Sequence, residues 1–426
     1  MKLDATLPDF FRVRQRFPRP RVASIESAVK NAVQQTRMNE RIKPGHSVAI
    51  TVGSRGVANI LEITQQVVLQ VKQLGGTPFI VPAMGSHGGA TPEGQLRVLA
   101  KFGITPATVA CDIRSSMNTV EICRAKEGFP VLFDSHARSA DHVLVVNRIK
   151  PHTRFFGSVE SGLMKMMLIG LGKHAGALVY HQVIQNYTFD QIVRSVAREV
   201  ISRCQIAGGI AILENGYDET ADIVGVEPLE IETVEPQLLN RVRELSPSLP
   251  FDHAELLIID AIGKNFSGSG MDTNIVGRKS NDRSALGDEL PRIHHIYVRR
   301  LSEETEGNAA GIGIAELCHQ RVLRQMDAEK TRINCITAGH IAVAMQPVDF
   351  PNDRAALQTA VALGGWGRSE DCSMMWIPNT LHIEEVECSQ IYYEQALKNE
   401  QLEIIRKPRP LRFDEHNDLW TPQWGV

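Results

Sequence analysis

Residues able to do acid–base, covalent and metal-binding chemistry concentrate between Lys150 and His181. This stretch holds three histidines, three lysines and five glycines, and an apolar run from Leu163 to Ile169 separates them. Each glycine inside a helix costs about 1 kcal/mol relative to alanine, so an ordinary core helix would not carry so many. Titratable side chains on an apolar, glycine-jointed frame are typical of a reactive site.

Three polar side chains follow segments with the character of buried strands: Arg55, His87 and His152. The strands are expected at residues 47–52, 78–82 and 142–147. The carboxyl ends of parallel strands meet at one edge of a sheet, where ligands bind in open α/β folds. We therefore expect the three side chains to converge on one crevice. An arginine there suits a planar carboxylate, because its guanidinium donates two parallel hydrogen bonds.

The elements that must position these groups alternate between short apolar strands and amphipathic helices, as at 57–74. This alternation predicts the α/β class, with two α/β domains built on mostly parallel sheets. The proline-rich segment 246–250 marks the predicted boundary between a cofactor-binding and catalytic domain, 1–248, and a C-terminal α/β domain, 249–426. We expect the active site in the cleft between the two domains.

The second domain is expected to begin with a strand at 255–260 and to continue with a strand at 294–299, helices over 312–328, a strand at 340–345 and a helix at 353–363. The tail from Lys407 is expected to pack as coil, and the tail after Arg368 is expected to fold back on the first domain.

The composition excludes several classes of protein. The chain has 426 residues, of which 43% are hydrophobic and 22% charged, with a formal net charge of −3. No global field favours nucleic acid or a membrane surface, and no apolar run approaches the length of a membrane span. The seven cysteines contain no CxxC pair, which argues against a disulfide framework and a zinc knuckle. A reducing cytoplasm is the simplest expected location.

Motifs for common chemistries are absent. The turn at 53–56 lacks the glycines and lysine of nucleotide-binding loops, and there is no HExxH, HxH or GxSxG sequence. Individually, Arg55 could be a surface turn residue and His181 a core histidine. One alternative therefore stays open, a zinc-dependent hydrolase or lyase that uses His87, His152 and His181 as ligands.

Taken together, these residues resemble the nickel-pincer lactate racemase family, over about 42–277. The segment Lys150–His181, with its Ser-Gly-Leu-Met-Lys sequence ending at Lys165, carries the resemblance most strongly. The resemblance implies that Lys165 covalently attaches a pyridinium-3,5-bisthiocarboxylic acid mononucleotide. It implies that His181 is the histidine that binds the nickel held by this group. Separate maturation enzymes would load the cofactor.

The family resemblance also implies a reaction. His87 and His152 match the two acid/base histidines, and Arg55 matches the arginine that binds the substrate carboxylate. Such a racemase inverts C2 of a 2-hydroxy acid by reversible hydride transfer, while a base takes the hydroxyl proton. Histidine suits this role because its ordinary pKa is near 6.5. A non-catalytic relative that keeps only the ligand-binding cleft is the third alternative.

The sequence departs from lactate racemase in the second domain. The block at 271–274 resembles a family motif, but Gly277 stands in the position of a substrate-binding glutamine, and the nearby lysine is not clearly retained. A glycine there is expected to leave room. Lys264, Asn274 and Arg278 are expected to donate to substrate. The sequence therefore predicts a 2-hydroxy acid larger than lactate, such as a sugar acid like gluconate.

Overall fold

The computed structural model describes residues 5–54, 56–363 and 369–425. They form two compact units. The N-terminal unit is Pro18–Ser246, and the C-terminal unit joins the segment through Phe17 to Pro247–Val426. No helix in the described residues is both long enough and apolar enough to cross a bilayer.

A six-stranded sheet with the order β4-β3-β2-β7-β8-β9 forms the centre of the N-terminal unit. Its strands are β2 (Ser47–Val52), β3 (Thr77–Pro82), β4 (Asp112–Ile113), β7 (His142–Arg148), β8 (Ile206–Glu214) and β9 (Thr220–Val226). All neighbours pair in parallel except β9, which is antiparallel to β8. A separate antiparallel hairpin consists of β5 (Thr119–Arg124) and β6 (Pro130–Asp134). The predicted α/β class with mostly parallel sheets is confirmed in this unit.

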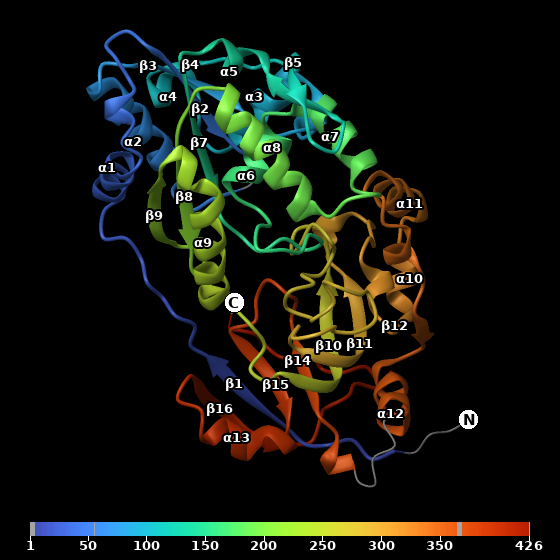
Figure 1. Ribbon diagram of the computed structural model, residues 1–426. Coiled ribbons are helices and arrows are strands. Elements are labelled where there is room, and N and C mark those ends of the chain that lie inside the picture. Colours follow the sequence, from blue (N-terminus) through green and yellow to red (C-terminus); the bar gives the residue numbers. More distant parts are fainter. Residues whose placement is uncertain (1–4, 55, 364–368, 426) are drawn as a thin grey trace. The chain divides into compact units, whose positions relative to one another are not determined.

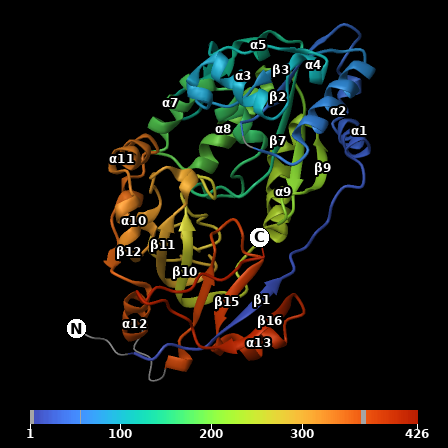
Figure 2. The same ribbon diagram turned by 180° about the vertical axis from the view of Figure 1, so that it is seen from behind.

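Helices cover both faces of this sheet (Figures 1 and 2). They are α1 (Ile25–Gln35), α2 (Ile60–Gln73), α3 (Pro92–Lys101), α4 (Pro106–Val109), α5 (Ser135–Ser139), α6 (Leu163–Lys165), a π-helix (Met166–Gly170), α7 (Lys173–Val183), α8 (Phe189–Arg203) and α9 (Ile231–Leu245). Short 3₁₀ turns lie at Met38–Glu40, Gly88–Ala90 and Pro228–Glu230.

Successive residues of β2 point to opposite faces, as the pleat of a strand requires. Val48 and Ile50 enter a core with α1 and α2, whereas Ala49 enters a core with α6, α8 and α9. Burial on both faces explains why the strand is apolar throughout, without polar alternation. The reactive stretch between Lys150 and His181 belongs to the second of these cores.

The C-terminal unit contains an eight-stranded sheet with the order β13-β12-β11-β10-β14-β15-β1-β16. Its strands are β1 (Phe10–Gln15), β10 (His253–Ile262), β11 (Arg292–Leu301), β12 (Leu317–His319), β13 (Val348–Phe350), β14 (Met374–Ile377), β15 (Glu385–Ser389) and β16 (Leu402–Arg409). The first five strands in this order are parallel, and the last three pairings are antiparallel.

Four α-helices and several 3₁₀ turns complete the described part of this unit. The helices are α10 (Gln320–Gln325), α11 (Ala328–Thr337), α12 (Asp353–Leu363) and α13 (Tyr393–Leu397). The turns are Glu303–Thr305, Ile312–Ile314, Ile341–Ala344, Ser369–Asp371 and Gln390–Tyr392.

The N-terminal strand corrects the predicted domain limits. The predicted domain 1–248 included residues 1–17, but β1 lies between β15 and β16 in the C-terminal sheet, dark blue between two red strands in Figure 1. Buried Arg12 fixes it there through ion pairs with Glu385 and Glu387, at 3.1 and 2.8 Å. Residues 407–409, predicted as coil, belong to β16, and β16 pairs with β1, which the prediction had assigned to the first domain.

Two other predictions for this unit are corrected by the structure. Helices are expected over 312–328, and the segment contains a 3₁₀ turn and α10, but Leu317–His319 is a strand that pairs with β11 and β13. The expected strand at 340–345 is a 3₁₀ turn, since the edge of the sheet is taken by β13 a few residues later.

Candidate active site

The sheet of the N-terminal unit reverses its direction of growth at β2. After β2 the chain adds β3 and β4 on one side, then returns to add β7 on the other side. Such a switch point leaves a crevice at the carboxyl ends of the strands. Ser54 follows β2, His87 follows β3 and His152 follows β7, so their loops leave neighbouring strands at one edge. Arg55 lies outside the described residues.

His87 is oriented by the loop after β2. Its Nδ1 is a hydrogen-bond partner of Ser54 Oγ, and its imidazole is exposed. When Nδ1–H donates to the serine oxygen, Nε2 keeps a lone pair. In this tautomer His87 can accept a proton at Nε2, whereas in the other tautomer Ser54 donates to Nδ1 and Nε2–H is a donor.

Phe155 brings His152 and Lys165 to one place. The His152 ring stacks on Phe155 with centroids 4.1 Å apart. The Lys165 Nζ lies 5.3 Å from the centroid of the same ring. His152 Nδ1 accepts hydrogen bonds from the backbone N–H groups of Arg154 and Phe155, at 3.1 and 3.2 Å. The neutral imidazole consequently carries its proton on Nε2, which it can donate to a ligand oxygen.

The segment that carries Lys165 packs directly against the strand ends. Asn147 at the end of β7 donates from Nδ2 to the Gly162 carbonyl, at 2.7 Å. Gly170, at the end of the π-helix, lies so close to β3 that a Cβ there would be 2.8 Å from the Ala83 carbonyl oxygen. A Cβ on Gly85, two residues before His87, would lie 3.0 Å from the Ile169 side chain. Close backbone packing at glycines thus joins the lysine segment to the His87 loop.

His181 is exposed on α7, and its neighbour Tyr180 connects it to the same aromatic group. The Tyr180 ring lies 5.6 Å from the His181 ring and 5.7 Å from Phe155, centroid to centroid. Burial raises the pKa of the Tyr180 phenol above its ordinary value. Its hydroxyl has no hydrogen-bond partner within the described residues. A buried hydroxyl without a partner is a donor that a bound ligand can satisfy.

Lys173 anchors the start of α7. Its amine is fully buried, forms a 3.1 Å ion pair with Asp134 and donates to the Pro82 carbonyl and to Gln95. Burial lowers the pKa of this amine, and the Asp134 charge opposes that effect. Since Pro82 ends β3, the lysine ties α7 to the strand that precedes the His87 loop. Lys173 therefore fixes the start of α7 relative to β3.

The remaining predicted residues belong to the C-terminal unit, and their polar groups contact their own loop. Lys264 donates from Nζ to the Gly268 carbonyl at 2.6 Å. Asn274 donates from Nδ2 to Asp272 Oδ1 at 2.9 Å. Both contacts organise the loop after β10. They leave the predicted role of these two residues in substrate binding as a prediction.

Arg278 and Gly277 have structural roles that differ from the predicted ones. Arg278 is 1% exposed, and its guanidinium pairs with Glu316 at 2.9 Å and donates to the Ile293 carbonyl. Its donors are therefore directed into the protein, and it is not a substrate-binding residue here. Gly277 has a φ of +63°, and a Cβ there would clash with the Pro291 carbonyl oxygen. This glycine is needed for close packing, so it provides no extra room for a larger substrate.

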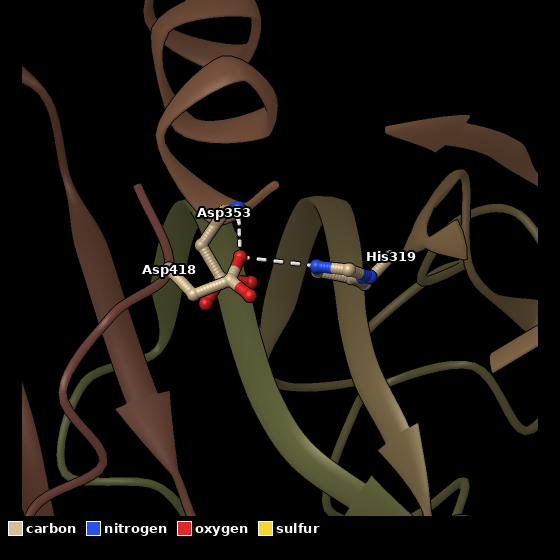
Figure 3. A group of neighbouring side chains, drawn as sticks. All are labelled: His319, Asp353 and Asp418. Carbon is tan, nitrogen blue, oxygen red and sulfur yellow. Dashed lines mark hydrogen bonds and ion pairs between the residues drawn. The ribbon is translucent and has the colours of Figure 1, made fainter. Parts of the chain in front are cut away.

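A second cluster of metal-ligand type lies in the C-terminal unit at His319, Asp353 and Asp418 (Figure 3). Asp418 Oδ1 accepts from His319 Nε2 at 3.0 Å and from the Asp353 backbone N–H at 3.1 Å. Asp353 also pairs with Arg299 at 2.8 Å, and Asp418 pairs with Arg321 at 2.5 Å. Two guanidinium groups already neutralise the carboxylates, so the cluster ties the C-terminal segment to α12 and is no candidate metal site.

A parallel α/β sheet with histidines and a lysine gathered at its switch point defines an α/β protein with an enzyme-like site. Residues 12–189 match the model of the lactate racemase N-terminal domain family. The predicted family resemblance is therefore confirmed.

One solved structure supports the fold. The lactate racemase apoprotein from Thermoanaerobacterium thermosaccharolyticum superposes with a TM-score of 0.54 at 14% identity, over 87% of this chain and 93% of that chain. A protein from Thermotoga maritima gives a TM-score of 0.44 at 13% identity, over 64% of this chain and 70% of that chain.

Among curated sequences, Chromodomain Y-like protein 2 of Mus musculus is 24% identical over 171 residues, which are 38% of this chain and 33% of that protein. The Homo sapiens protein of the same name is 24% identical over 159 residues, 35% of this chain and 31% of that protein. This chain therefore spans about a third of the length of these relatives.

The sequence did not predict the buried carboxylates that accept backbone hydrogen bonds from the segments carrying His152 and Lys165. Glu160 and Glu235 are both 1% exposed. Helix α9 starts at Ile231, so Glu235 lies inside it and shares its apolar stripe with Leu238 and Val242. The signal that could have identified Glu235 in the sequence is a charged residue at a position of the apolar stripe.

Proposed function

We propose that this chain is a racemase or epimerase that inverts C2 of a 2-hydroxy acid with a nickel-pincer nucleotide attached to Lys165. The match of residues 12–189 to the lactate racemase N-terminal domain family supports an isomerase acting on this substrate class. The observation that carries the proposal is that His152 and Lys165 both lie against the Phe155 ring, which also contacts Tyr180, the neighbour of His181.

The residues around Lys165 fit such a group. The amine lies over an aromatic face, and His181 offers an imidazole, a good nickel ligand in its neutral form. The unpartnered Tyr180 hydroxyl can donate to a polar group of the nucleotide. When bound, the group supplies a carbon that takes up and returns the hydride of C2.

The chain's own residues handle the substrate oxygens in this proposal. His87, oriented by Ser54, accepts the hydroxyl proton at Nε2. His152 donates from Nε2–H to a substrate oxygen on the other side. To exchange a proton itself, His152 must release the two backbone N–H groups that its Nδ1 accepts, because the protonated ring cannot accept them. Arg55 is proposed to bind the carboxylate.

The size of the substrate now depends on the loop of the C-terminal unit. The close packing at Gly277 leaves no extra room for a larger substrate, and buried Arg278 does not offer its donors to a substrate. Lys264 and Asn274 remain proposed donors for hydroxyl groups beyond C2. A sugar acid such as gluconate remains the proposed substrate on this ground, and lactate is the comparison.

The test is expression of the full chain with and without cofactor maturation enzymes, followed by mass analysis of the peptide that contains Lys165. We expect an adduct and bound nickel only after coexpression, and inversion at C2 for at least one acid in a panel that contains lactate and gluconate. Lys165→Ala should abolish the adduct, whereas Lys150→Ala, an exposed lysine of the same segment, should keep it.

Bound zinc without an adduct would contradict the proposal and support the hydrolase or lyase alternative. Substitution of Lys165 and His181 without loss of function would support the non-catalytic alternative. A cytoplasmic location is also part of the proposal.

A further inference from the structure

Helix α9 carries a carboxylate on its buried side. Glu235 is 1% exposed and lies on the same face as Ile231, Leu238 and Val242. Burial of an acidic group is unfavourable unless hydrogen bonds compensate for the lost water. Its Oε1 has no hydrogen-bond partner among the described residues. Because burying the Glu235 carboxylate is unfavourable, packing alone does not explain this side chain, and we expect it to have a specific role.

The contacts of Glu235 are all at the segment that leads into Lys165. Glu235 Oε2 accepts the backbone N–H of Met164 at 2.9 Å. Gly162 precedes α6 and has no side chain to accept the first free N–H groups of the helix, so the carboxylate of another helix does this. A Cβ on Gly162 would clash with Glu235 Oε1 and would lie 2.7 Å from Ile149 Cδ1. Glycine and glutamate are thus fitted to one another.

The opposite side of Gly162 is fixed as well, because its carbonyl accepts from Asn147. The backbone from Gly162 to Met164, directly before Lys165, is therefore held by β7 at Gly162 and by α9 at Met164. Lys165 itself cannot shift along the helix without breaking one of these contacts.

The same helix also holds the His152 loop. Arg243, two turns after Glu235, pairs with Glu160 at 2.7 Å. Glu160, which is buried, accepts the backbone N–H of His152 at 2.6 Å. One helix therefore braces both the lysine segment and the histidine loop through buried carboxylates.

We propose that Glu235 is a positioning residue for Lys165, fixing the backbone of Gly162–Met164 so that the lysine amine is presented for attachment of the cofactor. The part of this inference that concerns cofactor attachment rests on the proposed function. The part that concerns the backbone stands on the contacts alone.

The experiment compares three full-length variants. Glu235→Met keeps the buried volume and removes the acceptor, and Glu235→Gln keeps an acceptor for the Met164 N–H. Leu238→Ala, on the same face of α9, weakens the core without touching the contact. Hydrogen exchange of the 163–166 peptide is measured on the unloaded chain, together with acetylation of Lys165 by acetic anhydride. Adduct occupancy at Lys165 is measured after coexpression with maturation enzymes.

We expect Glu235→Met to raise exchange in 163–166 about tenfold, the effect of one lost hydrogen bond, and to lower adduct occupancy and change the acetylation rate. Glu235→Gln should stay near the wild type on all readouts. Leu238→Ala should raise exchange no more in this segment than in the rest of the unit. The proposal would be overturned if the 163–166 peptide of Glu235→Met exchanged at the wild-type rate. It would also be overturned if Leu238→Ala changed exchange in this peptide, acetylation and adduct occupancy as much as Glu235→Met does. Absence of adduct in the wild type would refute only the proposed function, because the exchange readout remains decisive for the backbone.

Discussion

Buried Glu235 should make the stability of the N-terminal unit depend on pH. Burial raises the pKa of this carboxyl to about 7, and hydrogen bonds from the Met164 and Leu163 amides only partly oppose the shift. In the unfolded chain the pKa returns to its ordinary value near 4.5. The folded state therefore binds the proton more tightly, so the contribution of Glu235 to stability is complete below pH 4.5 and is lost as the pH rises through about 7.

The size of the effect follows from the two pKa values. One unit of pKa shift corresponds to about 1.4 kcal/mol, so the full change is about 3 kcal/mol. Between pH 5.5 and 8 the linkage relation gives about 2 kcal/mol. Glu235→Gln cannot ionise. The free energy of unfolding of the wild type, relative to this variant, should therefore fall by about 2 kcal/mol over that range.

The assay must report on the N-terminal unit alone. All four tryptophans, at 366, 376, 420 and 424, belong to the C-terminal unit, so their fluorescence follows that unit only. Short deuterium pulses after equilibration in urea, read on peptides from β7 and β8, follow the N-terminal unit. The tryptophan signal then serves as the internal control, since Glu235→Gln should leave it unchanged. A wild-type-to-variant difference that stays constant from pH 5.5 to 8 would refute the reasoning.

Three further predictions concern packing at and around the site. Gly162→Ala should lower the stability of the N-terminal unit by roughly 2 kcal/mol, measured by thermal unfolding, and should reduce the Lys165 adduct, measured by mass analysis. Gly56→Ala is the control, because a Cβ there meets open space, and it should change neither quantity. Lys173→Met should cost roughly 3–5 kcal/mol in urea unfolding because it leaves Asp134 buried without its partner, and adding Asp134→Asn should recover part of the loss. Arg278→Ala should destabilise the C-terminal unit by a similar amount, seen in tryptophan fluorescence, and a changed KM with unchanged stability would instead restore it as a substrate-binding residue.

The sequence predicted the sheet of the N-terminal unit well because its signals are local. Each of β2, β3 and β7 is a short apolar run followed by polar residues, and a strand buried on both faces produces that pattern wherever it lies in the chain. The pairing of β1 with β15 and β16 could not be predicted in this way. It depends on buried ion pairs such as Arg12 with Glu385, between residues that are more than 370 positions apart.

The same distinction separates the predicted site residues from the missed ones. His87, His152, Lys165 and His181 attract notice because their types suit chemistry. Residues that act through backbone contacts have no such signature. Glu235 accepts a hydrogen bond from Met164, which is 71 positions away in the sequence. Its carboxylate fits there because residue 162 is a glycine, and the two residues meet only in the folded chain. A buried carboxylate on an apolar helix face, opposite a glycine that tolerates no Cβ, is therefore a structural feature by which further positioning residues can be sought in this fold.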